Sequence, residues 1–156
     1  MLQRFCSSVL VVLVVSVVAP VVKATDYDSP FTAGNTLSGS DCVYSSSGLI
    51  KLCLRPDWTM LYLEYLGPGE EYTIWESLFD GSWPYGTGTH TSQTSTPSDG
   101  HANMQYDGNF VVLPVEENYT VWSTVTNDNS GAYLAVEDDG NFLIYSQYDV
   151  PLWSLF

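Results

Sequence analysis

Residues 105–113 read Gln-Tyr-Asp-Gly-Asn-Phe-Val-Val-Leu, and Trp122-Ser123-Thr124 begins nine residues later. A second copy, residues 137–145, reads Glu-Asp-Asp-Gly-Asn-Phe-Leu-Ile-Tyr and is followed by Trp153-Ser154. In both copies Asp-Gly lies between two short runs of alternating apolar residues. This arrangement is a strong β-hairpin signal, because glycine takes positive φ at no steric cost and aspartate tolerates it. The predicted pairs are Asn103–Gln105 with Asn109–Leu113 and Leu134–Glu137 with Asn141–Tyr145.

A weaker third copy lies upstream, so the chain contains three units: unit one (residues 47–77), unit two (102–124) and unit three (130–154). Units two and three are offset by 32 residues and units one and two by 50, and the excess falls in a Ser/Thr/Gly/Pro-rich insert at 81–100. A single unit cannot bury its apolar face alone, whereas three small sheets facing one another can. We therefore expect a shared core that contains the tryptophan of each unit, with ligand stacking as the alternative role. These residues are Trp75, Trp122 and Trp153.

Outside the signal region described next, no apolar stripe of helical period is long enough to form a helix. Short alternating runs broken by Gly, Asp, Asn and Ser predict an all-β domain over residues 25–156. The polar stretch 25–36 is expected to supply an edge strand.

The N-terminus has the pattern of a secretory signal peptide, with Arg4, a valine-rich run from Phe5 to Val22 and a small residue at Ala24. We expect cleavage after residue 24; the alternative is a signal anchor. Cleavage would leave 2 basic and 18 acidic residues, a net charge of −16, against −14 for the whole chain. Such a surface repels nucleic acid and anionic membranes but not neutral partners. The prediction is a secreted, extracellular protein without a membrane anchor after cleavage.

Two cysteines, Cys42 and Cys53, remain after cleavage and are expected to form a disulfide in an oxidising compartment. Asn118 begins an Asn-Tyr-Thr sequon and is a predicted N-glycosylation site.

The repeated Gln-x-Asp-x-Asn-x-Val-x-Tyr pattern with its Trp-Ser ending resembles the bulb-type (monocot mannose-binding) lectin domain, over roughly residues 37–156. The resemblance implies the β-prism II fold, three four-stranded antiparallel sheets around a pseudo-threefold axis, with one shallow mannose pocket per sheet. It also implies dimers that exchange a C-terminal strand, although only a short tail follows Trp153.

By this resemblance the sugar-binding residues of units two and three follow position by position. They are Gln105, Asp107, Asn109 and Val111 in unit two, and Asp139, Asn141 and Tyr145 in unit three. The polar side chains would bind the hydroxyls around C2 and C3 of mannose, tyrosine would reach the C4 hydroxyl, and valine would contact the ring carbons. Leu113 stands at the tyrosine position of unit two, and Glu137 and Leu143 replace Gln and Val in unit three. Unit one, aligned as Arg55, Asp57, Thr59, Leu61 and Leu63, keeps only the aspartate and is interpreted as scaffold.

The chemistry of these residues suits a hexose, whose adjacent hydroxyls both donate and accept hydrogen bonds. The acidic run 137–139 is expected to raise the pKa of one carboxyl through like-charge crowding. That run lacks the spacing of a calcium loop, and a solvated turn is the preferred interpretation.

No catalytic motif, zinc spacing or phosphate loop is present in the sequence, and no metal, cofactor or catalytic residue is predicted. The leading hypothesis is a lectin that binds mannose-type glycans on glycoproteins or microbial surfaces, with several sites or a homo-oligomer supplying avidity. The alternative is a β-prism scaffold with degenerate sugar sites that acts through protein–protein contacts.

Overall fold

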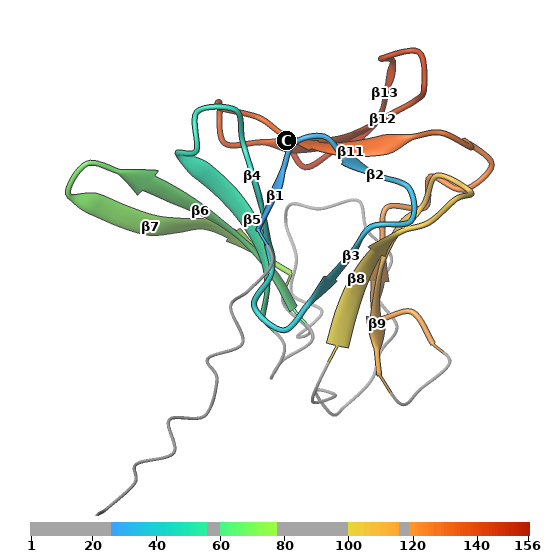
Figure 1. The fold of residues 1–156 in the computed structure, drawn as a ribbon, viewed down its shortest axis with the longest axis horizontal. Coiled ribbons are helices and arrows are strands. Elements are labelled where there is room, and N and C mark those ends of the chain that lie inside the picture. The colour runs from blue at the N-terminus through green and yellow to red at the C-terminus, as the bar shows by residue number, and fades with distance from the viewer. Residues whose placement is uncertain (1–25, 56–59, 78–99, 116–118) are drawn as a thin grey trace, which may run out of the picture.

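The computed structural model describes residues 26–55, 60–77, 100–115 and 119–156 (Figure 1). These residues contain thirteen strands and no helix, and hence none of them belongs to an apolar helix long enough to cross a membrane. The strands are β1 (Asp26–Asp28), β2 (Phe31–Thr32), β3 (Thr36–Ser38), β4 (Cys42–Tyr44), β5 (Ile50–Arg55), β6 (Met60–Gly67), β7 (Glu70–Glu76), β8 (Gly100–Met104), β9 (Phe110–Pro114), β10 (Trp122–Ser123), β11 (Tyr133–Val136), β12 (Phe142–Tyr145) and β13 (Pro151–Ser154).

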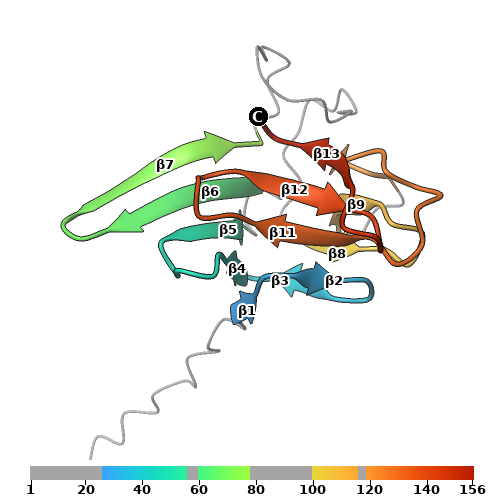
Figure 2. The same ribbon diagram turned by 90° about the horizontal axis from the view of Figure 1, so that it is seen from above.

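The strands form three sheets that surround a common centre, as Figure 1 shows. Their orders are β1-β4-β5-β6-β7, β10-β9-β8-β3 and β13-β12-β11-β2. The predicted three-sheet β-prism is confirmed, and the first sheet carries a fifth strand because β1 pairs with β4 in parallel. All other strand pairs are antiparallel. Figure 2 shows the β6–β7 hairpin of the first sheet extending past the other strands.

Each unit contributes a hairpin and then a third strand that starts or ends near its tryptophan. The predicted hairpins of units two and three are confirmed as β8–β9 and β11–β12, with Asn103 opposite Val111 and Leu134 opposite Ile144. The N-terminal segment supplies the fourth strands of the second and third sheets, where Leu37 pairs with Ala102 and Phe31 with Leu134. The lead-in thus completes two sheets.

The three unit tryptophans lie in the central core, as predicted. Their exposed fractions are 7%, 2% and 8% for Trp75, Trp122 and Trp153. The Trp122 ring centroid lies 6.1 Å from that of Trp75 and 5.6 Å from that of Trp153, both in edge-on arrangements. Phe110 and Phe142, fully buried, pack against the same cluster. Aromatic side chains bury large areas and favour such edge-to-face contacts, so this cluster holds the three sheets together.

A disulfide joins Cys42 and Cys53, which are opposite each other on β4 and β5. Three other predictions fall outside the described residues: the signal peptide at 1–24, residues 81–99 of the insert, and the sequon residue Asn118. The predicted insert ends at Gly100, but in the structure Gly100 is the first residue of β8.

Candidate functional site

The unit-two hairpin turns through residues 105–109, which lie between β8 and β9. Asp107 Oδ1 accepts a hydrogen bond from the Asn109 N–H at 3.0 Å, and Gln105 and Asn109 are joined by a backbone bond at 2.9 Å. Gly108 has φ 92°, and a side-chain carbon there would collide with the carbonyl oxygen of Asn129. The turn therefore requires glycine both for its φ and for the close approach of the 126–131 segment. One carboxylate oxygen of Asp107 holds the turn, and Asp107 is an exposed residue.

Asn109 is fixed through its side-chain oxygen. Its Oδ1 accepts bonds from Thr124 Oγ1 at 3.1 Å and from the Thr126 N–H at 3.2 Å. Thr126 Oγ1 in turn donates to the Gly108 carbonyl at 2.7 Å. With the oxygen engaged on the protein side, the carboxamide is oriented by its bonds, and the Nδ2 donors remain for a ligand.

Val111 lies on the opposite face of β9 from the core residues Phe110 and Val112, so it shares the outer face with the predicted polar residues. It is nevertheless only 2% exposed. The structure thus brings the unit-two residues to one hairpin, with Asp107 exposed, Gln105 and Asn109 half-buried, and Val111 covered. In this conformation Val111 offers a sugar ring little surface.

Unit three repeats the arrangement. Asp139 Oδ1 accepts the Asn141 N–H at 3.0 Å, and Asn141 Oδ1 accepts the Phe156 N–H at 3.3 Å. The asparagine oxygen is again tied to the segment just beyond the unit tryptophan. Two units with different flanking sequences therefore hold Asp and Asn in the same way.

Glu137 and Tyr145 of unit three bind each other. The Tyr145 hydroxyl donates to Glu137 Oε1 at 2.7 Å, and this bond raises the pKa of Tyr145. The Tyr145 ring also stacks on Tyr133, with centroids 5.6 Å apart. Substituting Glu for Gln therefore supplies an acceptor for the tyrosine proton, and a sugar hydroxyl would have to compete with that bond.

Asp138 binds unit one. Its carboxylate accepts hydrogen bonds from Ser46 Oγ at 2.9 Å, Ser47 Oγ at 2.7 Å and the Ser47 N–H at 3.0 Å. The hydroxyls of Ser45, Ser47 and Ser46 and the Ser47 N–H lower the pKa of Asp138. The expected rise from like-charge crowding is wrong for this residue, because hydrogen bonds to the ionised form lower its pKa.

The predicted register of unit one is also wrong. Trp75 pairs with Leu63, as Trp122 pairs with Val112 and Trp153 with Ile144. Leu61 and Leu63 are consequently core residues, equivalent to Phe110 and Val112, and each is fully buried. Five residues separate Met104 from its partner Phe110, but six separate Leu54 from its partner Leu61. The extra residue shifts the second strand by one position, which exchanges its two faces.

The corrected register places charged and aromatic residues where units two and three have pocket residues. Tyr62 is equivalent to Val111, Glu64 to Leu113, and the buried Met60 to Asn109. Asp57 and Thr59, the other positions first aligned with the pocket, lie outside the described residues.

Ion pairs cover this outer face of unit one. Lys51 Nζ lies 2.9 Å from Glu64 Oε2, and Arg55 lies 3.6 Å from Glu76 and 5.0 Å above the Tyr62 ring. Desolvation on this half-buried face and the adjacent Glu64 raise the pKa of Tyr62. Over residues 47–55 and 60–77, which the structure describes, this face has no asparagine amide to offer a sugar.

Sequence reasoning missed the residues that fix the asparagines. Thr124, 3% exposed, donates to Asn109 and accepts the Phe110 N–H at 3.1 Å. Ser77 of unit one likewise accepts the Leu61 N–H at 2.8 Å. Both residues lie two positions after the unit tryptophan, so the signal was a hydroxyl residue at that position.

Comparison with known proteins bears on the fold. No family model and no curated protein matches the sequence. Among solved structures, a lectin of Marasmius oreades aligns with a TM-score of 0.63 at 19% sequence identity, over 85% of this chain and 94% of that one. A monomeric monocot mannose-binding lectin of Gastrodia elata aligns with a TM-score of 0.59 at 23% identity, over 81% and 94%. A lectin of Allium sativum aligns at 0.54 and 22% identity, over 75% and 92%. These likenesses extend over most of the described strands, and the chain therefore has the β-prism II fold of these lectins.

Proposed function

We propose that this chain is a lectin that binds mannose or a related neutral sugar through the hairpins of units two and three. Its fold is that of the lectins of Marasmius oreades, Gastrodia elata and Allium sativum, and the Gastrodia elata protein is a mannose-binding lectin. Fold likeness alone does not assign a function. The proposal therefore depends on the two hairpins.

One observation carries the proposal: units two and three hold Asp and Asn by equivalent bonds. In each, one Asp oxygen accepts a hydrogen bond within the turn, and the Asn oxygen accepts one from the segment just beyond the unit tryptophan. The groups left over are a carboxylate oxygen, which accepts, and an amide nitrogen, which donates. Neighbouring sugar hydroxyls need this combination, and pre-oriented groups lose little entropy on binding.

Unit two is the stronger site of the two. Its Gln105 side chain can both donate and accept, whereas Glu137 of unit three already accepts the Tyr145 hydroxyl. One neutral hydrogen bond is worth about 0.5–1.5 kcal/mol, or roughly 2- to 12-fold in affinity. Leu113 stands at the tyrosine position of unit two and has no hydroxyl, which lowers the expected affinity of this site.

The net charge of −14 favours neutral glycans over sulfated or sialylated ones. We place the protein outside the cell, where the Cys42–Cys53 bridge would persist. Its partners would be mannose-type glycans on glycoproteins or microbial surfaces, bound through two hairpins per chain or through oligomers.

Retention on mannose-agarose tests the proposal with three variants. Asn109→Asp and Asn141→Asp keep the side-chain oxygen that the fold uses but remove the amide donor. Asn35→Ala is the matched control, because the Asn35 side chain donates to Thr32 Oγ1, while its contact with unit two is a backbone bond to the Met104 N–H that the change keeps. We expect the control to be retained like wild type, Asn109→Asp to lose most retention and Asn141→Asp to lose less.

Wild-type protein that passes through the column unretained would refute the lectin proposal and favour the alternative, a β-prism scaffold for protein–protein contacts. Full retention of the double variant Asn109→Asp/Asn141→Asp would leave the lectin proposal standing but reject these hairpins as its sites.

A further inference from the structure

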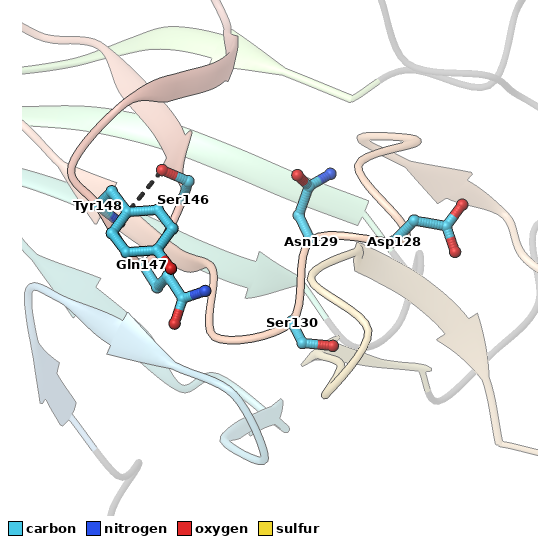
Figure 3. Close-up of a pocket in the computed structure, with 6 residues that line it drawn as sticks. All are labelled: Asp128, Asn129, Ser130, Ser146, Gln147 and Tyr148. Carbon is cyan, nitrogen blue, oxygen red and sulfur yellow. Dashed lines mark hydrogen bonds between the residues drawn. The ribbon is translucent and has the colours of Figure 1, made fainter.

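A recess of about 300 Å³ lies between two loops and is lined by residues other than the predicted sugar-binding residues of the hairpins. One loop joins β10 to β11 and the other joins β12 to β13. Figure 3 shows Ser146, Gln147 and Tyr148 on one side and Asp128, Asn129 and Ser130 on the other. The volume is at the lower end of the range for small-molecule pockets, roughly 300–1,000 Å³, and suits a single ring.

The β12–β13 side of the recess is held rigidly. Ser146 Oγ accepts the N–H groups of Tyr148 and Val150, each at 3.2 Å, and Ser146 and Val150 are also joined by a backbone bond of 2.8 Å. Asp149 accepts the Tyr133 hydroxyl at 2.6 Å, which raises the pKa of Tyr133 to about 12. This loop is therefore set before any ligand arrives.

The β10–β11 side is fixed as well. Asn129 Nδ2 donates to the carbonyls of Thr126 and Asn127 at 3.0 and 3.1 Å, and the Asn129 N–H donates to Asp107 at 2.8 Å. A side-chain carbon on Gly131 would lie 3.2 Å from Gln147 Cβ, so glycine lets the two loops approach here. With φ 82° at Gly131, the backbone also disfavours other residues.

Hydrogen-bonding groups remain available inside this rigid frame. Within the described part of the chain, the Ser130 hydroxyl, the Gln147 carboxamide and the Tyr148 hydroxyl have no hydrogen-bond partner, and Asn129 Oδ1 accepts none. Tyr148 is 78% exposed and presents an aromatic face beside them. A carboxamide, two hydroxyls and a carbonyl oxygen next to an aromatic ring form an amphipathic binding surface.

From this geometry we infer that the recess is a second, separate binding site for a neutral sugar ring. A pyranose has a face of C–H groups that can pack on Tyr148 and a rim of hydroxyls that can bond Ser130, Asn129 and Gln147. An anionic ligand is disfavoured by Asp128, although its carboxylate points away from Tyr148 in Figure 3, and by the net charge. The inference rests on the proposed lectin function, but it uses none of the hairpin side chains.

A titration of the isotope-labelled, disulfide-bonded chain with methyl α-mannopyranoside separates the two sites by amide NMR shifts. We expect shifts at Asn129, Ser130, Gly131, Gln147 and Tyr148 in addition to those at the hairpins. In Gln147→Ala/Tyr148→Ala the recess shifts should need at least about fivefold more sugar, the loss of a hydrogen bond and a ring contact. The hairpin shifts should be unchanged in that variant. In Asn109→Asp the unit-two hairpin shifts should need more sugar, and the recess shifts should be unchanged.

Hairpin shifts without recess shifts would overturn this inference and leave the proposed function intact. Recess shifts that vanish in Asn109→Asp but survive in Gln147→Ala/Tyr148→Ala would overturn it too, because they would be transmitted from unit two through the Asn129–Asp107 bond. No shift at any amide would refute both proposals.

Discussion

Units one and two are alike on the face that packs in the core and differ on the outer face. Leu61 and Leu63 of unit one occupy the core positions of Phe110 and Val112 in unit two, all four with no exposed surface. On the outer face, unit two has an Asp and an Asn fixed by hydrogen bonds, whereas unit one has ion pairs between strands of its sheet. Alternate residues of a strand point to opposite faces, so one face can keep the fold while the other changes use.

The difference begins with a single residue. Unit one has one more residue between its paired strands than units two and three. In the resulting register its second strand starts at the buried Met60, which lies at the position of Asn109 and has no amide. One repeat can therefore change its outer face through loop length and the residue at this position, with the core left intact.

The shared core gives the largest predicted effect. Trp122 contacts the tryptophans of both other units, so Trp122→Ala should lower the free energy of unfolding by about 3–5 kcal/mol. Tyr106→Ala, at a side chain 78% exposed, is the control and should change it by less than about 0.5 kcal/mol. Urea denaturation measures both. A loss under about 1 kcal/mol for Trp122→Ala would mean that the three sheets do not depend on one core.

The disulfide joins β4 to β5 of unit one, and unit two contains no cysteine. Replacing Cys42 and Cys53, 11 residues apart, with alanine should cost about 2–3 kcal/mol through the added entropy of the unfolded chain. Amide hydrogen exchange should locate the effect, with protection falling first in β4 and β5. An equal fall of protection in β8 and β9 would show that unit one has no separate stability.

These features differ in how far the sequence could predict them. Asp-Gly turns are local, so Asp107-Gly108 and Asp139-Gly140 predicted the hairpins correctly. The tryptophans predicted the shared core because a single unit cannot bury its apolar face alone. One feature depends on a contact between distant residues. Asp138 binds Ser47, 91 positions away, and a local interpretation could describe it only as part of an acidic turn.

The unit-one register failed for a different reason. Its loop departs from the Asp-Gly pattern, and alternation alone cannot fix a register when both faces of a strand carry large residues such as Leu61, Tyr62 and Leu63. The strand pairing with Trp75 resolves it. The roles of Thr124 and Thr126 were equally hidden, since a hydroxyl near a tryptophan does not say which side chain it will hold.

Asn109 should separate structural from binding roles. Asn109→Ala removes the acceptor of the Thr126 N–H. Because Thr126 is only 6% exposed, this change should lower the free energy of unfolding by about 1–3 kcal/mol. Asn109→Asp keeps that acceptor and should stay within about 1 kcal/mol of wild type while losing mannose retention. Thermal unfolding and the mannose column together make the distinction.

The same change in unit three is the internal control. Asn141 bonds the N–H of Phe156, an exposed residue at the end of the sequence, so Asn141→Ala should cost less than about 0.5 kcal/mol. If Asn109→Ala and Asn141→Ala lowered the free energy of unfolding equally, the difference in burial between Thr126 and Phe156 would have no effect on stability, contrary to this prediction.

The smallest effect is expected at the outer face of unit one. Arg55 is 38% exposed in its side chain and Glu76 is 29%, and ion pairs this accessible are worth about 0–1 kcal/mol. Arg55→Met keeps an unbranched chain over Tyr62 but removes the charge, so any loss should shrink as salt rises from about 0.01 M to about 1 M. Arg55→Lys is the matched control: it retains charge and gives up the planar contact with the ring.

If Arg55→Lys lowers the free energy of unfolding as much as Arg55→Met, the contact with Tyr62 and not the charge stabilises unit one. If Arg55→Met is salt-independent and costs well over about 1 kcal/mol, the pair belongs to the fold and not to a surface free to change. The outer face of unit one would then be as constrained as its core. In that case, loop length alone would not explain why unit one differs from unit two.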